Sequence, residues 1–307
     1  TDELALNFNE ETTIDNGSCE YPDNGDYSLY FDGNSFVNAG DVEFENNTEM
    51  TLYAQVMFSV IEDRDVTIIS KYEGNGAVPG ESIDREFSLF RHDAERDYKI
   101  YFNVSGDGNN DFEFASQTSM IANEWYDITV TFDNGYIKLY IDGILENSYQ
   151  HPNIQSIHLS DNPVIFGGGL IEGIPFGNFN GEISLIYILN SVLSEDNIQT
   201  SLEEIQLSSE LIALWKFNAG EDNIVYDHSG NQNHGTIYGE VNWVENIYGC
   251  TDPLACNYNE EVDFDNGSCD YESCADCAGI LNGDAFVDCV GTCADGSLMS
   301  WLGDNIC

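Results

Sequence analysis

The chain has 307 residues, with 56 Asp and Glu against 8 Lys and Arg and a formal net charge of −48. A surface of this charge repels nucleic acid and anionic membranes and attracts divalent cations. The charge therefore argues against a nucleic-acid partner. No run of 18 apolar residues occurs, so we expect no membrane insertion either. Two explanations of the acidity stay open: adaptation of a soluble protein to salty water, where self-repulsion is screened, and ligation of calcium.

The first element along the chain is a repeat. Residues 1–21 (TDELALNFNEETTIDNGSCEY) align without a gap on residues 251–271 (TDPLACNYNEEVDFDNGSCDY), with 14 of 21 positions identical at a constant offset of 250. We interpret the two segments as copies of one module. Each copy is too short to bury a core, so a disulfide, with or without a metal, must hold it.

The nine cysteines are unevenly placed, with Cys19 alone and the other eight between Cys250 and Cys307. Dense cysteines in a segment without His favour disulfides and an oxidising compartment. A zinc site is the alternative, but it rests on Cys274-x-x-Cys277 with no second Cys-x-x-Cys pair to complete it.

Comparison of the two repeats predicts one disulfide. The second copy has Cys250, Cys256 and Cys269. The first copy has Leu6 in place of Cys256 and keeps Cys19 in place of Cys269. The bond expected within the module is therefore Cys250–Cys269, and Cys256 pairs elsewhere.

The counterpart of Cys250 would stand directly before Thr1. Cys19 should then pair with an upstream cysteine of a longer precursor or with another chain. Placing the end of one copy, which closes with Cys307, before the start of the next restores a cysteine in register. The hypothesis is that copies join head to tail, with Cys307 of one unit bonded to Cys19 of the next, which gives an open fibre.

Alternating apolar residues predict a series of antiparallel strands after the first repeat. Even-numbered residues 52–60 form one face of a strand, and residues 66–70 form another strand. Residues 73–81 (EGNGAVPGE) between strands form a loop rich in Gly. This pattern favours a meander of strands packed on one face.

The clearest element is a hairpin over residues 123–143 (NEWYDITVTFDNGYIKLYIDG). Apolar residues alternate on both sides of Asp133-Asn134-Gly135, which tolerate positive φ and allow a tight turn. Tyr136 and Tyr140 share the face opposite the apolar one. They could form a sugar-stacking platform, a patch covered by a partner, or the packing surface of a second sheet.

Trp125, Tyr140, Asp142 and Gly143 match the hairpin pattern W-x-x-ϕ-x-ϕ-x-(turn)-x-ϕ-x-ϕ-Y-ϕ-D-G, where ϕ is apolar. In these residues the chain resembles the laminin-G-like (concanavalin-A-like) jelly-roll family. The resemblance implies an all-β fold, an antiparallel jelly-roll sandwich.

A short helix is expected at about residues 194–206, because Ser194 can cap it and Ile198, Leu202 and Ile205 line one face. Residues 211–245 then resemble the first strands of the same family again. Only about 35 residues lie between the helix and the second repeat, too few for a second sandwich. We therefore expect these strands to fold back into the first sandwich.

From Gly249 onward the second repeat resembles the GCTDP-x-ACNY…DGSC repeats of large secreted proteins of marine bacteria. The motif Asp276-Cys277-x-Gly279 recurs 12 residues later as Asp288-Cys289-x-Gly291. This segment resembles the DCxGxCxGD tails of such proteins, although Leu281 stands where the second unit has Cys293. The resemblance implies a secreted protein associated with the cell surface.

Four parts are expected, with small disulfide-stapled, Asp/Gly-rich modules at both ends of the sandwich. They are a partial repeat at 1–25, the jelly roll at 26–248, the second repeat at 249–273 and an Asp/Cys-rich tail at 274–307.

No catalytic motif is found. The β-glucanases of the family carry E-x-D-x-x-E, and the nearest match, at residues 261–266, ends in Asn and lies in the second repeat. The five His residues form no H-E-x-x-H, and G-x-S-x-G is missing. We expect no enzymatic activity.

Calcium is the expected cofactor. Asp227, Ser229, Asn231 and Asn233 place oxygen-bearing side chains at alternate positions, as a loop around a hard cation requires. The alternative is a turn whose side chains satisfy the backbone. Weaker candidates are Asp263 and Asp265, which resemble the start of a calcium loop without its final Glu, and three residues of the tail, Asn282, Asp284 and Asp288.

These observations predict a non-enzymatic extracellular structural or adhesive protein, such as a repeating unit of a surface fibre or giant adhesin, stabilised by disulfides and calcium. Its expected partners are copies of itself, end to end, and a glycan or other extracellular ligand. The alternative is a calcium-dependent carbohydrate-binding module of a secreted glycan-binding or glycan-degrading system.

Overall fold

The computed structural model describes residues 1–14, 17–74, 84–172, 174–271 and 273, with the backbone of Phe286–Val287 and Cys293–Ala294. The chain falls into two compact units, residues 1–245 and 246–307, which are described separately. The first repeat thus belongs to the same unit as the strands that follow it. Within the described part, no helix is long and apolar enough to cross a membrane.

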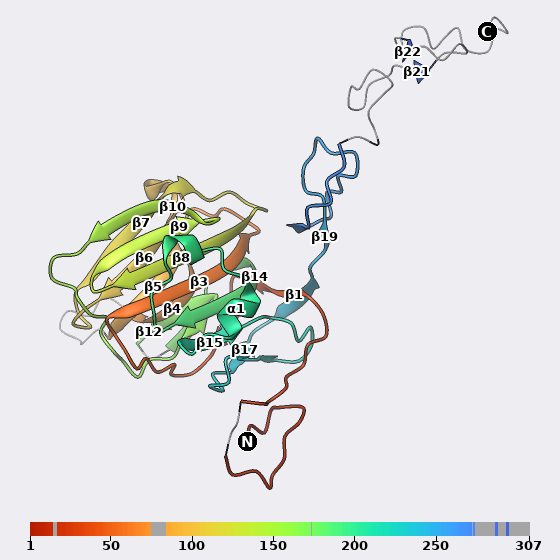
Figure 1. The fold of residues 1–307 in the computed structure, drawn as a ribbon. Helices are drawn as coiled ribbons and strands as arrows, with labels where there is room; N and C mark the ends of the chain where they lie inside the picture. The colour runs from red at the N-terminus through yellow and green to blue at the C-terminus, as the bar shows by residue number, and fades with distance from the viewer. Residues whose placement is uncertain are drawn as a thin grey trace, which may run out of the picture. The chain divides into compact units, whose positions relative to one another are not determined.

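Two sheets form the first unit (Figure 1). One has the order β10-β9-β8-β3-β14-β1-β18, with β15 also paired to β14. Its strands are β1 (Tyr27–Asp32), β3 (Glu49–Phe58), β8 (Trp125–Asp133), β9 (Tyr136–Ile141), β10 (Ile144–Gln150), β14 (Asn180–Leu189), β15 (Leu211–Trp215) and β18 (Val241–Glu245).

The other sheet has the order β16-β17-β2-β11-β4-β5-β6-β7, and the hairpin of β12 and β13 joins β4. Its strands are β2 (Phe36–Asn38), β4 (Val66–Gly74), β5 (Arg85–Arg91), β6 (Lys99–Ser105), β7 (Asp111–Ser119), β11 (Ile165–Phe166), β12 (Gly168–Ile171), β13 (Ile174–Gly177), β16 (Ile224–Val225) and β17 (Gly235–Tyr238). The expected all-β jelly-roll sandwich is confirmed.

The predicted central hairpin is present, and its alternation builds the core. The inward residues of β8 and β9 pair across the hairpin and are buried in the main hydrophobic cluster: Ile128, Val130, Phe132, Ile137, Leu139 and Ile141. The turn uses positive φ at Asn134 and Gly135, as its sequence predicted. The assignment of Val60 to a buried face is wrong, because β3 ends at Phe58 and Val60 is 46% exposed.

The opposite face of β9 is the outer face of its sheet. Tyr140 is buried there, and Tyr136 is 37% exposed. The neighbouring Lys138 Nζ lies 2.7 Å from Glu195 Oε1, so the segment after β14 lies against this face. The interpretation of the two tyrosines as a packing surface for the second sheet is wrong, since the second sheet packs on the apolar face.

The predicted helix at 194–206 is split into η2 (Glu195–Asn197) and α1 (Leu202–Gln206). Ser201 caps α1 by accepting from Glu204 N, whereas Ser194 makes no side-chain capping bond. A Thr-Ser pair competes with the helical backbone, which explains the break. Ile205 is still buried, against Tyr53 and Tyr187 on the outer face of β3 and β14, as the position of α1 in Figure 1 illustrates.

Residues 211–245 add strands to both sheets. β15 pairs with β14 and β18 with β1, while β17 pairs with β2 in the other sheet. The segment therefore completes the first sandwich and does not start a second one.

The Asp227 side chain holds this returning segment in place. It is fully buried, and one oxygen accepts from Leu214 N and Ser229 N, both at 2.9 Å. The other accepts from Ser229 Oγ at 2.8 Å and Asn233 N at 2.9 Å. Hydrogen bonds from several backbone N–H groups are what a buried carboxylate requires.

The second unit contains the disulfide that the repeat comparison predicted. Cys250 and Cys269 are bonded, with an S–S distance of 2.02 Å and Cα atoms 4.8 Å apart. Cys256 is also disulfide-bonded. Short strands β19 (Tyr248–Gly249) and β20 (Phe264–Asp265) pair in parallel, and β21 (Phe286–Val287) pairs with β22 (Cys293–Ala294).

Asp227→Ala should lower the free energy of unfolding of the first unit by about 3 kcal/mol or more, because each buried donor left unsatisfied costs about 1–3 kcal/mol. Urea denaturation monitored by tryptophan fluorescence measures the change. The exposed Asp161 provides the control, and Asp161→Ala should change stability by less than about 0.5 kcal/mol. Equal stability of the two variants would contradict the role of Asp227.

His228 should make the first unit less stable as the pH falls below 7. Burial, together with the nearby Lys216, lowers the pKa of His228 to about 4. Because the unfolded chain binds this proton near pH 6.5 and the folded chain does not, stability is full above pH 6.5 and is lost on acidification. At pH 5.5 the loss from this group is about 1.4 kcal/mol. His228→Gln should remove this contribution from the difference in unfolding free energy between pH 7.5 and pH 5.5. If that difference is the same in the variant and the wild type, His228 is not its source.

Candidate functional site

The predicted calcium loop is engaged with strand β15. The Ile212 carbonyl accepts hydrogen bonds from Ser229 Oγ at 3.0 Å, Asn231 Nδ2 at 2.8 Å and Asn233 Nδ2 at 3.0 Å. Together with the bonds to Asp227, these contacts match the backbone-satisfying turn that the sequence also allowed. The oxygens of Asp227 and Ser229 are therefore used within the protein.

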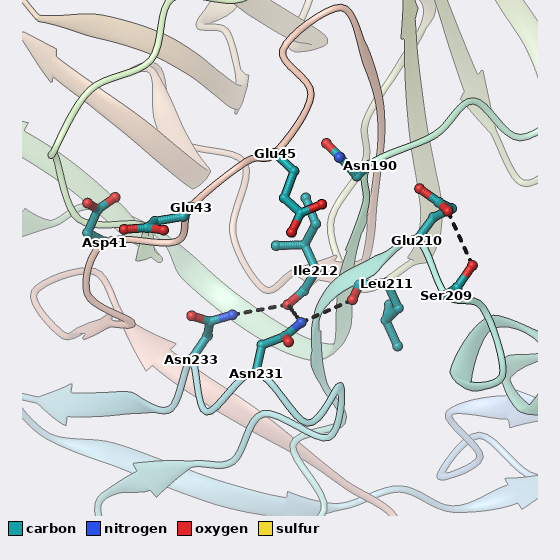
Figure 2. A pocket seen from close by; sticks show the side chains of 10 residues that line it. All are labelled: Asp41, Glu43, Glu45, Asn190, Ser209, Glu210, Leu211, Ile212, Asn231 and Asn233. Carbon is teal, nitrogen blue, oxygen red and sulfur yellow. Dashed lines mark hydrogen bonds between the residues drawn. The ribbon is translucent and has the colours of Figure 1, made fainter. Parts of the chain in front are cut away.

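Asn231 and Asn233 also line an acidic pocket of about 420 Å³ (Figure 2). Its other lining residues are Asp41, Glu43, Glu45, Asn190, Ser209, Glu210, Leu211 and Ile212. The two Asn side chains donate their amide nitrogens to carbonyls of β15. Each amide oxygen is therefore directed away from β15. Four carboxylates and two amide oxygens around one pocket are the ligand types of Ca²⁺.

The charge of this pocket is partly balanced from inside the sandwich. Lys71, which is buried, lies 2.7 Å from Asp41 Oδ1 and 3.2 Å from Glu86 Oε2. Burial raises the pKa of Glu86 to about 7, although Lys71 opposes the shift. Asp41 is thus committed to Lys71, and the remaining charge of the pocket comes from Glu43, Glu45 and Glu210.

The other predicted calcium residues are not brought to this pocket. Asp263 Oδ2 accepts from Ile247 N at 2.8 Å, and Asp265 Oδ1 accepts from Gly267 N at 2.8 Å, both in the second unit. The tail residues Asn282, Asp284 and Asp288, like Cys307, lie outside the described residues. The calcium assignments stay predictions.

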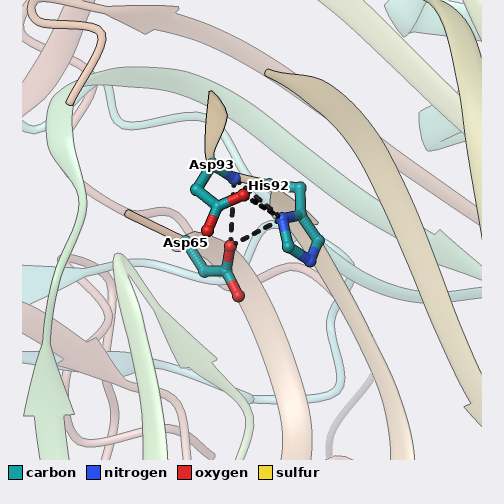
Figure 3. A group of neighbouring side chains, drawn as sticks. All are labelled: Asp65, His92 and Asp93. Atoms are coloured by element: carbon teal, nitrogen blue, oxygen red, sulfur yellow. Dashed lines mark hydrogen bonds and ion pairs between the residues drawn. The ribbon is translucent and has the colours of Figure 1, made fainter. Parts of the chain in front are cut away.

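Sequence reasoning missed a group of three possible metal ligands, Asp65, His92 and Asp93 (Figure 3). His92 Nδ1 lies 3.0 Å from Asp65 Oδ1 and 2.9 Å from Asp93 Oδ1. The same oxygens accept from backbone N–H groups of Asp93 and Glu95, both at 3.0 Å. These bonds give the three residues a structural role at the start of β4 and the end of β5. No spacing motif in the sequence predicts the cluster.

A second cavity, of about 370 Å³, lies where residues 106–111 approach residues 151–156. It is called the Asp111 cavity here. Its polar lining includes Asp107, Asn110, Asp111, Asn153, Gln155 and Ser156. The strands that lead to it, β7 and β10, are edge strands of the two sheets, and Asn147 Nδ2 joins them by donating to Ala115 O at 2.9 Å.

Aromatic side chains stand beside this cavity. The ring of Tyr149, on β10, is stacked on that of Phe112, on β7, at a centroid distance of 5.1 Å. His151 lines the cavity, and its ring centroid lies 4.8 Å from that of Phe112. Tyr149 is 42% exposed, so one apolar ring is available to a ligand.

Asp111 is held by three side chains. Its carboxylate accepts from Arg85 Nη1 at 2.7 Å, Asn103 Nδ2 at 2.7 Å and Tyr72 Oη at 3.2 Å. Within the described residues, two buried atoms of this network, Asn103 Oδ1 and Arg85 Nε, have no hydrogen-bond partner. The three bonds hold the Asp111 carboxylate in one place, so it can accept from a ligand in the cavity without first being ordered.

Two further groups define the chemistry of the cavity. Hydrogen bonds from Asn110 and Asn109 lower the pKa of Asp107 to about 2, so this carboxylate stays ionised at neutral pH. His151 Nδ1 accepts from Ile154 N at 2.8 Å, so in the neutral imidazole Nε2 carries the proton. Hydroxyl groups would therefore meet acceptors at Asp107 and Asp111 and a donor at His151.

No sequence motif predicts the Asp111 cavity. Phe112 lies about 40 residues before Tyr149 and His151, and only the approach of two sheet edges brings them together. The tyrosines that the sequence did single out, Tyr136 and Tyr140, are on β9 and do not line it.

The fold resembles those of known proteins. A putative carbohydrate binding protein from Bacteroides ovatus has 18% sequence identity and a TM-score of 0.53, over 73% of this chain and 62% of that chain. A heptameric SAP-like pentraxin from Limulus polyphemus has 13% identity and a TM-score of 0.44, over 57% and 81% of the two chains. The CBM40 of the Ruminococcus gnavus IT-sialidase has 16% identity and a TM-score of 0.43, over 56% and 94%.

No curated protein matches the chain. The chain matches less than two thirds of the length of the Bacteroides ovatus protein, and at these identities the likeness concerns the fold alone. The model of one family, described as the concanavalin A-like lectin/glucanases superfamily, matches residues 31–199. Because this match covers more than half of the chain, the protein belongs to the concanavalin A-like lectin/glucanase superfamily, through a laminin-G-like domain.

Proposed function

We propose that this protein is a non-enzymatic, extracellular adhesive module that binds a glycan in the Asp111 cavity. The observation that carries the proposal is the His151 ring, which lines the cavity together with Asp107 and Asp111 and has its centroid 6.2 Å from that of the exposed Tyr149 ring. A sugar has an apolar face that packs on an aromatic ring and hydroxyl groups that bond to carboxylates and amides. The cavity offers both kinds of contact.

The size of the cavity supports a small ligand. Its volume of about 370 Å³ falls at the lower end of the range for small-molecule sites. The fold supports the same proposal, because the similar Bacteroides ovatus protein is described as a putative carbohydrate binding protein. A terminal sugar or a disaccharide is the ligand class that fits.

Binding is favoured over catalysis by the state of the carboxylates. A glycosidase needs one carboxyl group that is protonated near neutral pH to act as general acid. Asp107, whose pKa is lowered to about 2, cannot serve as that acid. Asp111 is already bonded to Arg85, Asn103 and Tyr72.

The extracellular assignment rests on the disulfide, which persists in oxidising compartments. In the proposed assembly, copies are joined end to end as units of a surface fibre or adhesin.

Tyr149→Ala should weaken glycan binding about tenfold, because loss of an aromatic contact costs on the order of 1 kcal/mol. A glycan array identifies the ligand, and calorimetry with the best ligand measures Kd. The control is Tyr238→Ala, since Tyr238 is 47% exposed and also stacked, on Phe36 at 5.0 Å. Equal affinities of the two variants, or an array on which no glycan binds, would refute the proposal.

Calcium binding in the acidic pocket is a second proposal, favoured by the convergence of Glu43, Glu45 and Glu210 with Asn231 and Asn233. A bound ion would offset two of these three negative charges and tie the loop before β3 to the loop after β16. Oxygen ligands of this kind suit a hard cation.

Calcium at 100 times its Kd should stabilise the first unit by about 2.7 kcal/mol through mass action. The unfolding midpoint should therefore rise with CaCl₂ and not with NaCl of equal ionic strength. Glu45→Gln should abolish the calcium-specific rise of the unfolding midpoint. Glu240→Gln is the control and should leave that rise unchanged, because Glu240 is exposed and lies outside the pocket. An identical calcium response in both variants would rule the pocket out.

A further inference from the structure

Four described residues within the repeated segment 1–21 pack on the sandwich. Asp2, Ala5 and Tyr21 are buried, and Cys19 packs beside them against Ala219 and Tyr226. These four are called the docking face. The surface beneath them, called the receptor face, comprises Ala219, Tyr226 and His234, with Ile224 and Trp243 at its margin.

The contact combines aromatic packing with one hydrogen bond between an imidazole and a carboxylate. Tyr21 is stacked on Tyr226 at 5.5 Å and lies edge-on to His234 at 4.9 Å. The Asp2 carboxylate accepts from Tyr21 Oη at 2.7 Å and lies 2.6 Å from His234 Nε2. Burial tends to raise the pKa of Asp2, but hydrogen bonds from Leu4 N, Tyr21 and His234 hold it below its ordinary value.

The second repeat has the same local structure. Tyr271 Oη donates to Asp252 Oδ2 at 2.6 Å, as Tyr21 does to Asp2. Leu254 N donates to Asp252 Oδ1 at 2.9 Å, the same distance as from Leu4 N to Asp2 Oδ1. The two copies therefore share the hydrogen bonds that position this Asp and Tyr.

All four residues of the docking face are identical in the second repeat. Their counterparts are Asp252, Ala255, Cys269 and Tyr271. The seven positions at which the copies differ all lie outside this face. Tyr271, however, is 46% exposed, whereas Tyr21 is 8% exposed. The second repeat thus carries a complete docking face whose central ring is open to solvent.

We propose that the second repeat docks on the receptor face of a second copy of this chain, in place of that molecule's own first repeat. Tyr271 would stack on Tyr226, and Asp252 would pair with His234. The receptor suits this occupant because Tyr226 and His234 Nε2 are the partners of Tyr21 and Asp2, and the second repeat has Tyr and Asp at the corresponding positions. The contact is heterologous, so repeated docking gives an open chain of copies.

This inference rests on the proposed end-to-end association. It specifies a non-covalent contact for that association, between the second repeat of one molecule and the receptor face of the next. The first repeat is tethered to its own sandwich and therefore has the higher effective concentration. The wild-type chain should accordingly associate weakly. Weakening the first repeat should expose the receptor face to the second repeat of another molecule.

The test uses full-length variants and sedimentation over a range of protein concentrations. Tyr21→Ala should raise the association constant at least about tenfold over the wild type, since it removes a stacked ring from the competing module. Tyr21→Ala/Tyr271→Ala should return association to the wild-type level or below. Asp2→Ala serves as a second variant of the same kind if Tyr21→Ala fails to fold.

A matched control is Tyr258→Ala in the Tyr21→Ala chain. Tyr258 is 43% exposed on the same repeat but is not a counterpart of the docking face, so association should persist. Non-reducing gels should show monomers, which separates docking from a Cys307–Cys19 bond. A Tyr21→Ala chain that stays monomeric, or a double variant that associates equally well, would overturn the docking proposal.

The two proposals can fail separately. Tyr149→Ala should leave association unchanged, and Tyr271→Ala should leave glycan affinity unchanged, because Tyr149 and Tyr271 lie in different units. A wild-type chain that binds no glycan, with association of the Tyr21→Ala chain intact, would refute only the Asp111 cavity as the glycan site.

Discussion

The four hydrogen bonds to the buried Asp227 carboxylate are the interaction on which the rest of the structure depends. They fix the loop between β16 and β17 against β15, so that residues 211–245 can supply strands to both sheets. Tyr226 and His234 of the receptor face lie on either side of this loop. Asn231 and Asn233 of the acidic pocket belong to it. A carboxylate that resembled a metal ligand in sequence is thus the anchor of two candidate binding surfaces.

Charge is distributed unequally through the molecule. Among the few basic residues, Lys71 is paired with Asp41 and Glu86, Arg85 with Asp111, and Lys138 with Glu195. Most acidic residues are left without a cation and face solvent, where salt screens their repulsion. Arg85 differs from the other paired basic residues, because its partner Asp111 is the carboxylate that we assign to glycan recognition.

The two proposed contacts use different parts of the fold. The Asp111 cavity lies where the edge strands β7 and β10 approach each other, and edge positions leave side chains accessible. The receptor face is built from the returning segment near β16 and β17. A sandwich can therefore bind a ligand at one place and a neighbouring copy at another without competition between them. This separation suits an adhesive unit that must be linked and must also bind.

The sequence by itself determined the features that depend on local periodicity and on the internal repeat. The alternation around Asp133-Asn134-Gly135 identified the hairpin and its buried face, and the two copies of the module identified the Cys250–Cys269 bond. Local pattern failed where a short polar stretch broke the helix before Ser201. Only the tertiary structure decided which residues meet across strands: Tyr149 with Phe112, Asp65 with His92, and Tyr21 with Tyr226. Such contacts are set by sheet closure between segments far apart in the chain, and no spacing within one segment encodes them.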